Sequence, residues 1–95
     1  MKVKFKEWNC VIEKANYQAD DSVALELVEE GTGDPVLMAT VCIPEGTPKE
    51  GYVLIKNWSE NEGMLEALQE AGVIGPAIDT VPTGYVLAHL CKLLI

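Results

Sequence analysis

Residues 57–72 are the one stretch of this 95-residue chain whose apolar residues are spaced as in an α-helix. This feature limits the possible folds more than any other in the sequence. Its buried stripe is predicted to consist of Met64, Leu65, Leu68 and Ala71. Ser59 and Glu62 match a capping box with Ser59 as the N-cap, and Gly72 is expected to end the helix as its C′ residue. One helix of this length cannot form a core alone, so the remaining apolar segments must supply a sheet.

Those remaining segments alternate between apolar and polar residues or are apolar throughout, which favours β-strands. We expect five strands, in "KVKFKEWNCVIEK", "VALELV", "VLMATVCI", "YVLIK" and "YVLAHLCKLLI". The first needs a bulge or break near Glu7, because the parity of its apolar positions changes there. The last is apolar on both faces and should be central. Loops rich in Pro and Gly are expected at 44–51 and 75–84.

The predicted fold is therefore a single α+β domain over residues 1–95, with a mostly antiparallel, five-stranded curled sheet and one helix. The elements follow the order β-β-β-β-α-β. A single short helix covers only part of one sheet face, although two of the strands are apolar on both sides. The sheet is thus expected either to curl into a partly closed barrel or to bury its other face in a two-fold homodimer.

The charge of the chain limits its partners. Fifteen Asp and Glu residues face seven Lys and no Arg, which gives a net charge of −8 and removes the residue that most often contacts phosphates and guanine edges. We therefore expect no direct nucleic-acid binding. The opening "MKVKFKEW" lacks the apolar core of a secretory signal, and no segment approaches the ~20 apolar residues of a membrane span. A soluble, cytoplasmic protein without membrane contact is expected.

The cysteines and the single histidine are the residues closest to a metal or catalytic pattern. Cys10, Cys42 and Cys91 are odd in number and lie in apolar runs, as reduced core thiols do. His89 shares a strand face with Cys91, and the other two thiols could complete a zinc-type set, but the chain has no C-x-x-C knuckle. No flanking residue is placed to orient His89 for a Cys–His pair. We predict no metal, no cofactor and no catalytic residue, so an enzyme is the less favoured class.

The predicted helix carries an acidic ladder, Glu62, Glu66 and Glu70, without a Lys or Arg nearby in the sequence. Like charges four residues apart repel each other on a helix. The ladder is either a solvated face or a surface kept acidic for a basic partner protein. Trp58, just before the helix, either lies flat over Gly63 at the edge of the core or is exposed as an aromatic anchor. Trp58, Glu62, Glu66 and Glu70 are the predicted partner-binding residues.

The segments "NWSENEGMLEALQEAGVI", "VPTGYV" and "LCKLL" resemble a family of small bacterial proteins of unassigned function that is associated with phages, plasmids and gut-bacterial mobile elements. The resemblance extends from "WNCVIEK" through "VALELV" to "LCKLL", and a SENEGMLEALxEAG-type motif is its most specific part. It implies a compact α+β domain with an accessory role in a mobile element. It implies no activity, cofactor or catalytic residue.

Two functions follow as hypotheses. The first is a non-enzymatic, acidic accessory protein that binds another protein through its surface, for which a flat or convex acidic face is expected. The alternative is a small enzyme or small-molecule-binding domain with a pocket between the sheet and loops 44–51 and 75–84. A deep pocket that contains His89 or Asp79 would favour this alternative.

Overall fold

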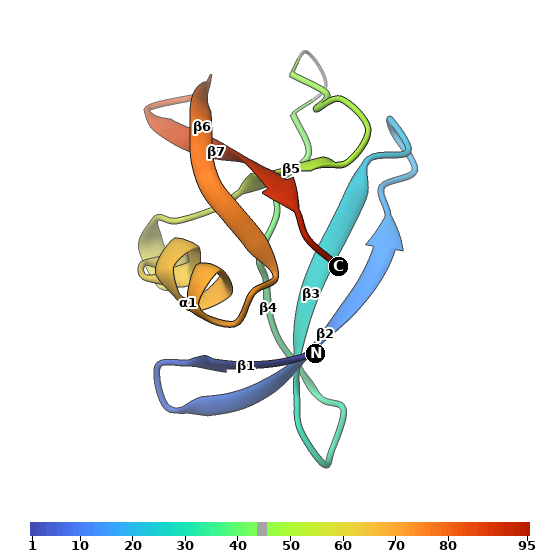
Figure 1. Ribbon diagram of the computed structural model, residues 1–95, viewed down its shortest axis with the longest axis vertical. Helices are drawn as coiled ribbons and strands as arrows, with labels where there is room; N and C mark the ends of the chain where they lie inside the picture. The colour runs from blue at the N-terminus through green and yellow to red at the C-terminus, as the bar shows by residue number, and fades with distance from the viewer. Residues whose placement is uncertain (44–45) are drawn as a thin grey trace.

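The computed structural model describes residues 1–43 and 46–95, and Figure 1 shows the path of the chain. The elements in chain order are β1 (Lys2–Phe5), β2 (Trp8–Asn16), β3 (Val23–Glu29), β4 (Pro35–Met38), β5 (Tyr52–Ile55), a 3₁₀ turn η1 (Ser59–Asn61), α1 (Met64–Glu70), β6 (Ile74–Thr83) and β7 (Val86–Leu93). The strands form a four-stranded sheet of order β1-β2-β3-β4 and a three-stranded sheet of order β5-β7-β6. All neighbouring strands are antiparallel.

The single five-stranded sheet expected from the sequence is therefore wrong. The expected first strand is a hairpin: β1 and β2 pair through Phe5 and Trp8, and Lys6 adopts a positive φ of 54° in the turn. The proposed break near Glu7 is thus a complete chain reversal. The range 75–84, expected to be a loop, forms most of β6 and the turn after it.

Prolines misled the sequence-based assignment of β6. Pro76 and Pro82 lie in a strand at the end of its sheet, where a residue without an N–H group is tolerated. Pro82 lies opposite Leu87 and has no N–H group to donate to β7, so its nitrogen can face the outer edge of the sheet. Because hydrogen-bonding directions alternate along a strand, the nitrogen of Thr80, two residues earlier, faces the same edge. The Thr80 N–H group donates instead to the carboxylate of Asp79, at 2.7 Å. This part of the β6 edge offers no unoccupied backbone donor at either position.

The two sheets are joined near the middle of the chain. Thr40 forms a bridge with Ile55, and the Lys56 N–H group donates to the carbonyl of Ala39 at 2.9 Å. The segment after β4 thereby connects one sheet to β5 of the other. The outermost strands of the combined structure are β1 and β6, and α1 contacts both of them (Figure 1). The helix thus covers the gap that these two strands leave.

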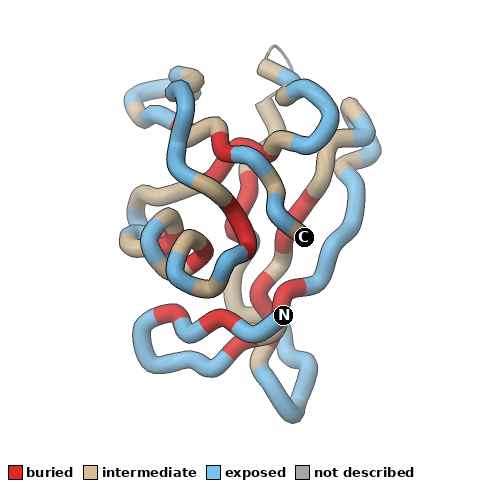
Figure 2. Tube along the Cα trace, viewed as in Figure 1, coloured by how far each residue is buried: buried red, intermediate tan, exposed pale blue. Residues whose placement is uncertain are grey.

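Both sheets and the helix share one hydrophobic core. Figure 2 shows the buried segments in the interior between them, whereas the hairpin tips are exposed. The buried members of the core are Val3, Phe5, Cys10, Ile12, Leu25, Leu27, Ala39, Val53, Ile55, Met64, Leu68, Val73, Ile74 and Cys91. The last strand was expected to be central, and this is confirmed within its sheet because β7 lies between β5 and β6. Because the two sheets cover each other's inner faces, an uncovered sheet face no longer supports a dimer.

The start of the helix differs from the capping box that the sequence predicted. Ser59 begins η1 with a positive φ of 54°, Gly63 has a φ of 93°, and α1 starts only at Met64. Neither the Ser59 nor the Glu62 side chain caps a helix end; the Leu65 N–H group donates instead to the side-chain oxygen of Asn57, at 2.8 Å. The left-handed glycine interrupts the expected continuous helix, because it turns the chain between η1 and α1.

The end of the helix agrees with its prediction. Gly72 has a φ of 76° and directly follows Ala71, the C-cap residue. The Gly72 N–H group donates to the Gln69 carbonyl at 3.1 Å, and the Val73 N–H group donates to the Leu68 carbonyl at 3.0 Å. These two bonds form a Schellman motif and confirm Gly72 as the C′ residue.

Candidate functional site

The three glutamates of the predicted acidic ladder are all exposed, but only two of them lie in a helix. Glu66 and Glu70 belong to α1. Glu62 lies between η1 and Gly63 with a φ of −55° and a ψ of 127°. The ladder is therefore a pair four residues apart, preceded by a third carboxylate on non-helical backbone.

The charges on this surface differ in how well the fold accommodates them. Glu66 lies in the first turn of α1, where exposed backbone N–H groups favour a carboxylate. Glu70 lies in the last turn, which contains no basic residue. Within residues 1–43 and 46–95, none of Glu62, Glu66 and Glu70 forms an ion pair. Glu62 and Glu70 are thus not at the N-terminal end of α1, where a negative charge is stabilised, and neither forms an ion pair with a described lysine.

A neighbouring carboxylate, Glu60, provides a contrast. Its Oε1 lies 3.0 Å from the Nζ of Lys56, while the Lys6 ammonium donates to its backbone carbonyl at 3.1 Å. A hydrogen bond from its own backbone amide lowers the pKa of Glu60, and the Lys56 ammonium lowers it further. The protein thus neutralises the acid in η1 and leaves the acids around α1 uncompensated.

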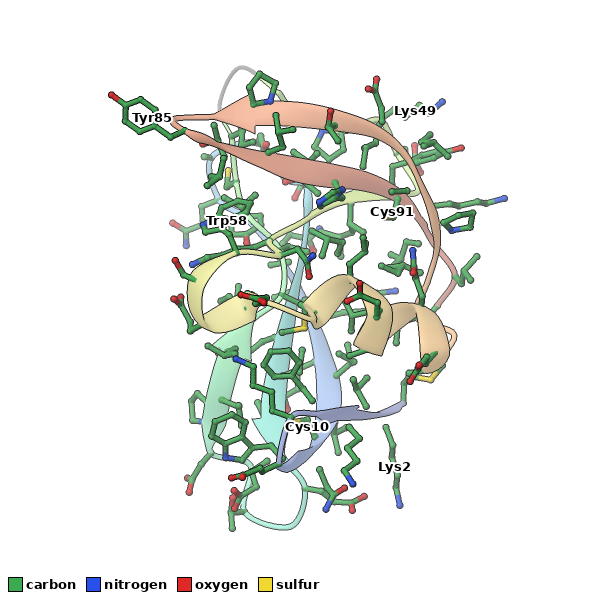
Figure 3. All side chains as sticks on the ribbon, turned by 90° about the vertical axis from the view of Figure 1, so that its left-hand side faces the viewer. Lys2, Cys10, Lys49, Trp58, Tyr85 and Cys91 are labelled. Carbon is green, nitrogen blue, oxygen red and sulfur yellow. The ribbon has the colours of Figure 1, made fainter. Side chains whose placement is uncertain are left out.

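Trp58 immediately precedes η1 and is half-buried. Figure 3 shows it between the β6–β7 hairpin and η1. The Lys56 Nζ lies 5.9 Å from the centre of its ring, within the range of a cation–π contact. The structure does not support an indole packed on Gly63, because among the described residues the side chain that a Cβ placed there would meet is Phe5, at 4.0 Å. Gly63 is explained by its positive φ instead.

The zinc-type arrangement of cysteines and His89 is not assembled. Among the described residues, no three His, Cys, Asp or Glu side chains gather in a way that could hold a metal ion. Cys10 is in one sheet, Cys91 is in the other, and Cys42 follows the bridge between them. None of the three forms a disulfide.

The thiol of Cys91 is not poised as a nucleophile. Burial raises the pKa of Cys91 to about 11, so the thiol is protonated at neutral pH. Its sulfur contacts the backbone carbonyl of His89 at 3.8 Å, not the imidazole. Burial also raises the pKa of Cys10 and of Cys42, and nearby acidic side chains raise both further.

A hollow of about 510 Å³ lies between the β2–β3 connection and the segment that leads into β5. Its lining includes Asp21, Thr47, Lys49 and Tyr52, but neither His89 nor Asp79. For the pocket expected between the sheet and loops 44–51 and 75–84, the second loop is wrong, because residues 75–84 belong to the β6–β7 hairpin, and this hollow does not reach them. Residues 44–45 lie outside the described part of the chain.

One carboxylate in this hollow was missed from the sequence. The Oδ1 of Asp20 accepts from the N–H group of Ser22 at 3.0 Å and from its hydroxyl at 2.6 Å, and its Oδ2 accepts from the Thr47 hydroxyl at 2.9 Å. These bonds, above all the one from the Ser22 hydroxyl, lower the pKa of Asp20. The D-x-S spacing could have suggested the local turn, but not the contact with Thr47. Both oxygens accept hydrogen bonds, so Asp20 joins the β2–β3 connection to the segment that leads into β5.

The described chain has no helix that is both long and apolar enough to cross a membrane. No protein-family model, curated protein or solved structure matches the chain. The surface just described must therefore carry any functional argument.

Proposed function

We propose that the protein is a non-enzymatic interaction module whose acidic surface around α1 binds a basic partner protein. The observation that carries this proposal is the contrast between Glu60, which is paired with Lys56, and the exposed Glu62, Glu66 and Glu70, which have no ion pair among the described residues. A surface of one sign attracts an oppositely charged partner and orients it before contact. Trp58 offers a half-buried aromatic ring next to this surface.

The setting of this interaction is also a proposal. The resemblance of the SENEGMLEALxEAG-type segment supports an accessory role in a bacterial mobile element or phage, acting in the cytoplasm. A homodimer is a separate prediction, which light scattering at micromolar concentration tests. A strict monomer at high concentration would contradict it.

The alternative, a small enzyme or small-molecule binder, rests on the hollow of about 510 Å³. This volume lies within the range of ligand sites, but such sites are mostly apolar. The hollow is lined by charged and polar residues, and its Asp20 carboxylate is already bonded to both loops. The acidic surface is therefore the better-supported site.

The test is an affinity pull-down from a bacterial lysate with the parent protein and with the double variant Glu66→Lys and Glu70→Lys, at low and high salt. A matched control, Asp34→Lys with Glu50→Lys, makes the same charge change at exposed positions outside β1 and β6, the strands that α1 contacts. A partner that the parent and the control recover, and that the α1 variant loses while still folded, would support the proposal. A partner retained by the α1 variant at physiological salt would show that this face is only solvated.

A further inference from the structure

The outer face of the four-stranded sheet holds a second pair of carboxylates, which the proposed function does not use. Glu13 of β2 lies directly opposite Glu26 of β3 in the strand register. Ile12 and Leu27 point into the core, so the alternation along each strand places both glutamates on the other face. Glu13 is exposed and Glu26 is half-exposed.

This pairing is unfavourable for the isolated protein. Residues directly opposite each other on one sheet face have Cβ atoms about 4.5–5.5 Å apart, and like charges there repel. In the part of the chain that the structure describes, neither glutamate has an ion-pair partner. Lys14, the nearest lysine in sequence, donates from its ammonium to the backbone oxygen of Ile95 at 3.2 Å. The sheet therefore presents two adjacent negative charges and does not neutralise them.

The surface beside this pair is hollowed, and apolar side chains form part of its lining. Ala15 lies opposite Ala24, one position along the same face, and Met38 of β4 lies opposite Glu26. Together with Glu13 and Lys14 these residues line a hollow of about 480 Å³. Small alanine side chains leave this space open, and the Met38 side chain remains 38% exposed at its edge.

We propose that this hollow receives an arginine side chain of a partner protein, with the guanidinium between Glu13 and Glu26 and the aliphatic stem on Ala15, Ala24 and Met38. The inference rests on the proposed binding of a basic protein and names a second surface and the group it recognises. A planar guanidinium can donate to two carboxylates at once, and it is less strongly hydrated than an ammonium. Its stem matches an apolar floor that a small inorganic cation would leave uncovered.

The test uses methyl NMR spectra of the protein labelled at alanine and methionine. The probe is the peptide acetyl-Gly-Arg-Gly-amide, compared with the same peptides containing lysine or the neutral isostere citrulline. We expect saturable shifts at Ala15, Ala24 and Met38 with the arginine peptide at millimolar concentration, weaker shifts with lysine and none with citrulline. In Glu13→Gln with Glu26→Gln, binding should weaken about tenfold or more, as the loss of a charge-assisted hydrogen bond implies.

A matched variant, Glu66→Gln with Glu70→Gln, makes the same charge change on α1 and should bind the peptide as the parent does. Unmoved Ala15, Ala24 and Met38 methyls, equal shifts with the lysine peptide, or unchanged binding in the Glu13/Glu26 variant would each overturn the inference. A partner that is lost with Glu66→Lys and Glu70→Lys but retained with Glu13→Gln and Glu26→Gln would also overturn it. That last result would leave the proposed function standing.

Discussion

Two substitutions at the start of α1 can distinguish a cap by Asn57 from the capping box of Ser59 and Glu62 that the sequence predicted. The structure assigns the cap to Asn57, whose side-chain oxygen accepts from the Leu65 N–H group at 2.8 Å in a partly buried position. Replacing an N-terminal capping side chain by alanine costs about 1 kcal/mol. We therefore expect Asn57→Ala to lower the free energy of unfolding by ~1 kcal/mol, because the Leu65 N–H group loses its partner where water reaches it poorly.

Ser59→Ala should behave differently. The capping box predicted from the sequence would give this substitution the same ~1 kcal/mol cost. In the structure Ser59 is exposed and its side chain makes no capping bond, so a change within about 0.5 kcal/mol is expected.

The assay is urea denaturation followed by circular dichroism, with thermal melting as a second measurement. A loss of ~1 kcal/mol in a domain of this size lowers the melting temperature by about 4–8 °C. Asn57→Asp is the matched control, because it retains the accepting oxygen and should stay close to the parent. An unchanged midpoint for Asn57→Ala, together with a full loss for Ser59→Ala, would refute the reasoning and restore the capping box.

Three further substitutions test other parts of the structure. Glu70→Lys should raise stability by a few tenths of a kcal/mol, because it places a cation in the last turn of α1 four residues after Glu66; a lower denaturation midpoint would contradict this. Gly63→Ala should cost about 1 kcal/mol or more, because φ is 93° there while the space for a Cβ is adequate; an unchanged midpoint would show that the backbone carries no strain. Asp20→Ala should lower the melting temperature more at pH 7 than at pH 3. The folded pKa of Asp20 is lowered, so its stabilisation is present above the unfolded pKa of about 3.9 and is lost as the pH falls through the folded value. A difference that is independent of pH would contradict the role given to its ionised form.

Local signals predicted the parts of the fold that local chemistry determines. Gly72 ends the helix as expected, because only a glycine readily adopts the left-handed conformation that its two hydrogen bonds require. The apolar character of β7 on both faces likewise predicted its central place between two strands. In both cases the residues near the position contained the necessary information.

The errors arose where distant contacts decide the structure. Pro76 and Pro82 indicate a loop unless the strand that contains them lies at an edge, which depends on the order of strands in the sheet. The start of α1 depends on Gly63 and on Asn57, which is eight residues from the amide it caps. The candidate sites divide in the same way. The exposure of Glu66 and Glu70 followed from helical spacing, whereas the opposition of Glu13 and Glu26 is a property of strand register that neither segment shows alone.

The outer edge of β6 has a consequence for how the protein can meet other chains. A ten-residue strand at the end of a sheet would ordinarily be a template onto which another polypeptide adds as a further strand. Pro82 cannot donate to such an addition, and Asp79 already occupies the N–H group of Thr80. Edge-to-edge polymerisation through this strand is therefore obstructed at two successive donor positions. The tip of the β6–β7 hairpin offers a side chain for contact instead, because the ring of Tyr85 projects fully into solvent there (Figure 3).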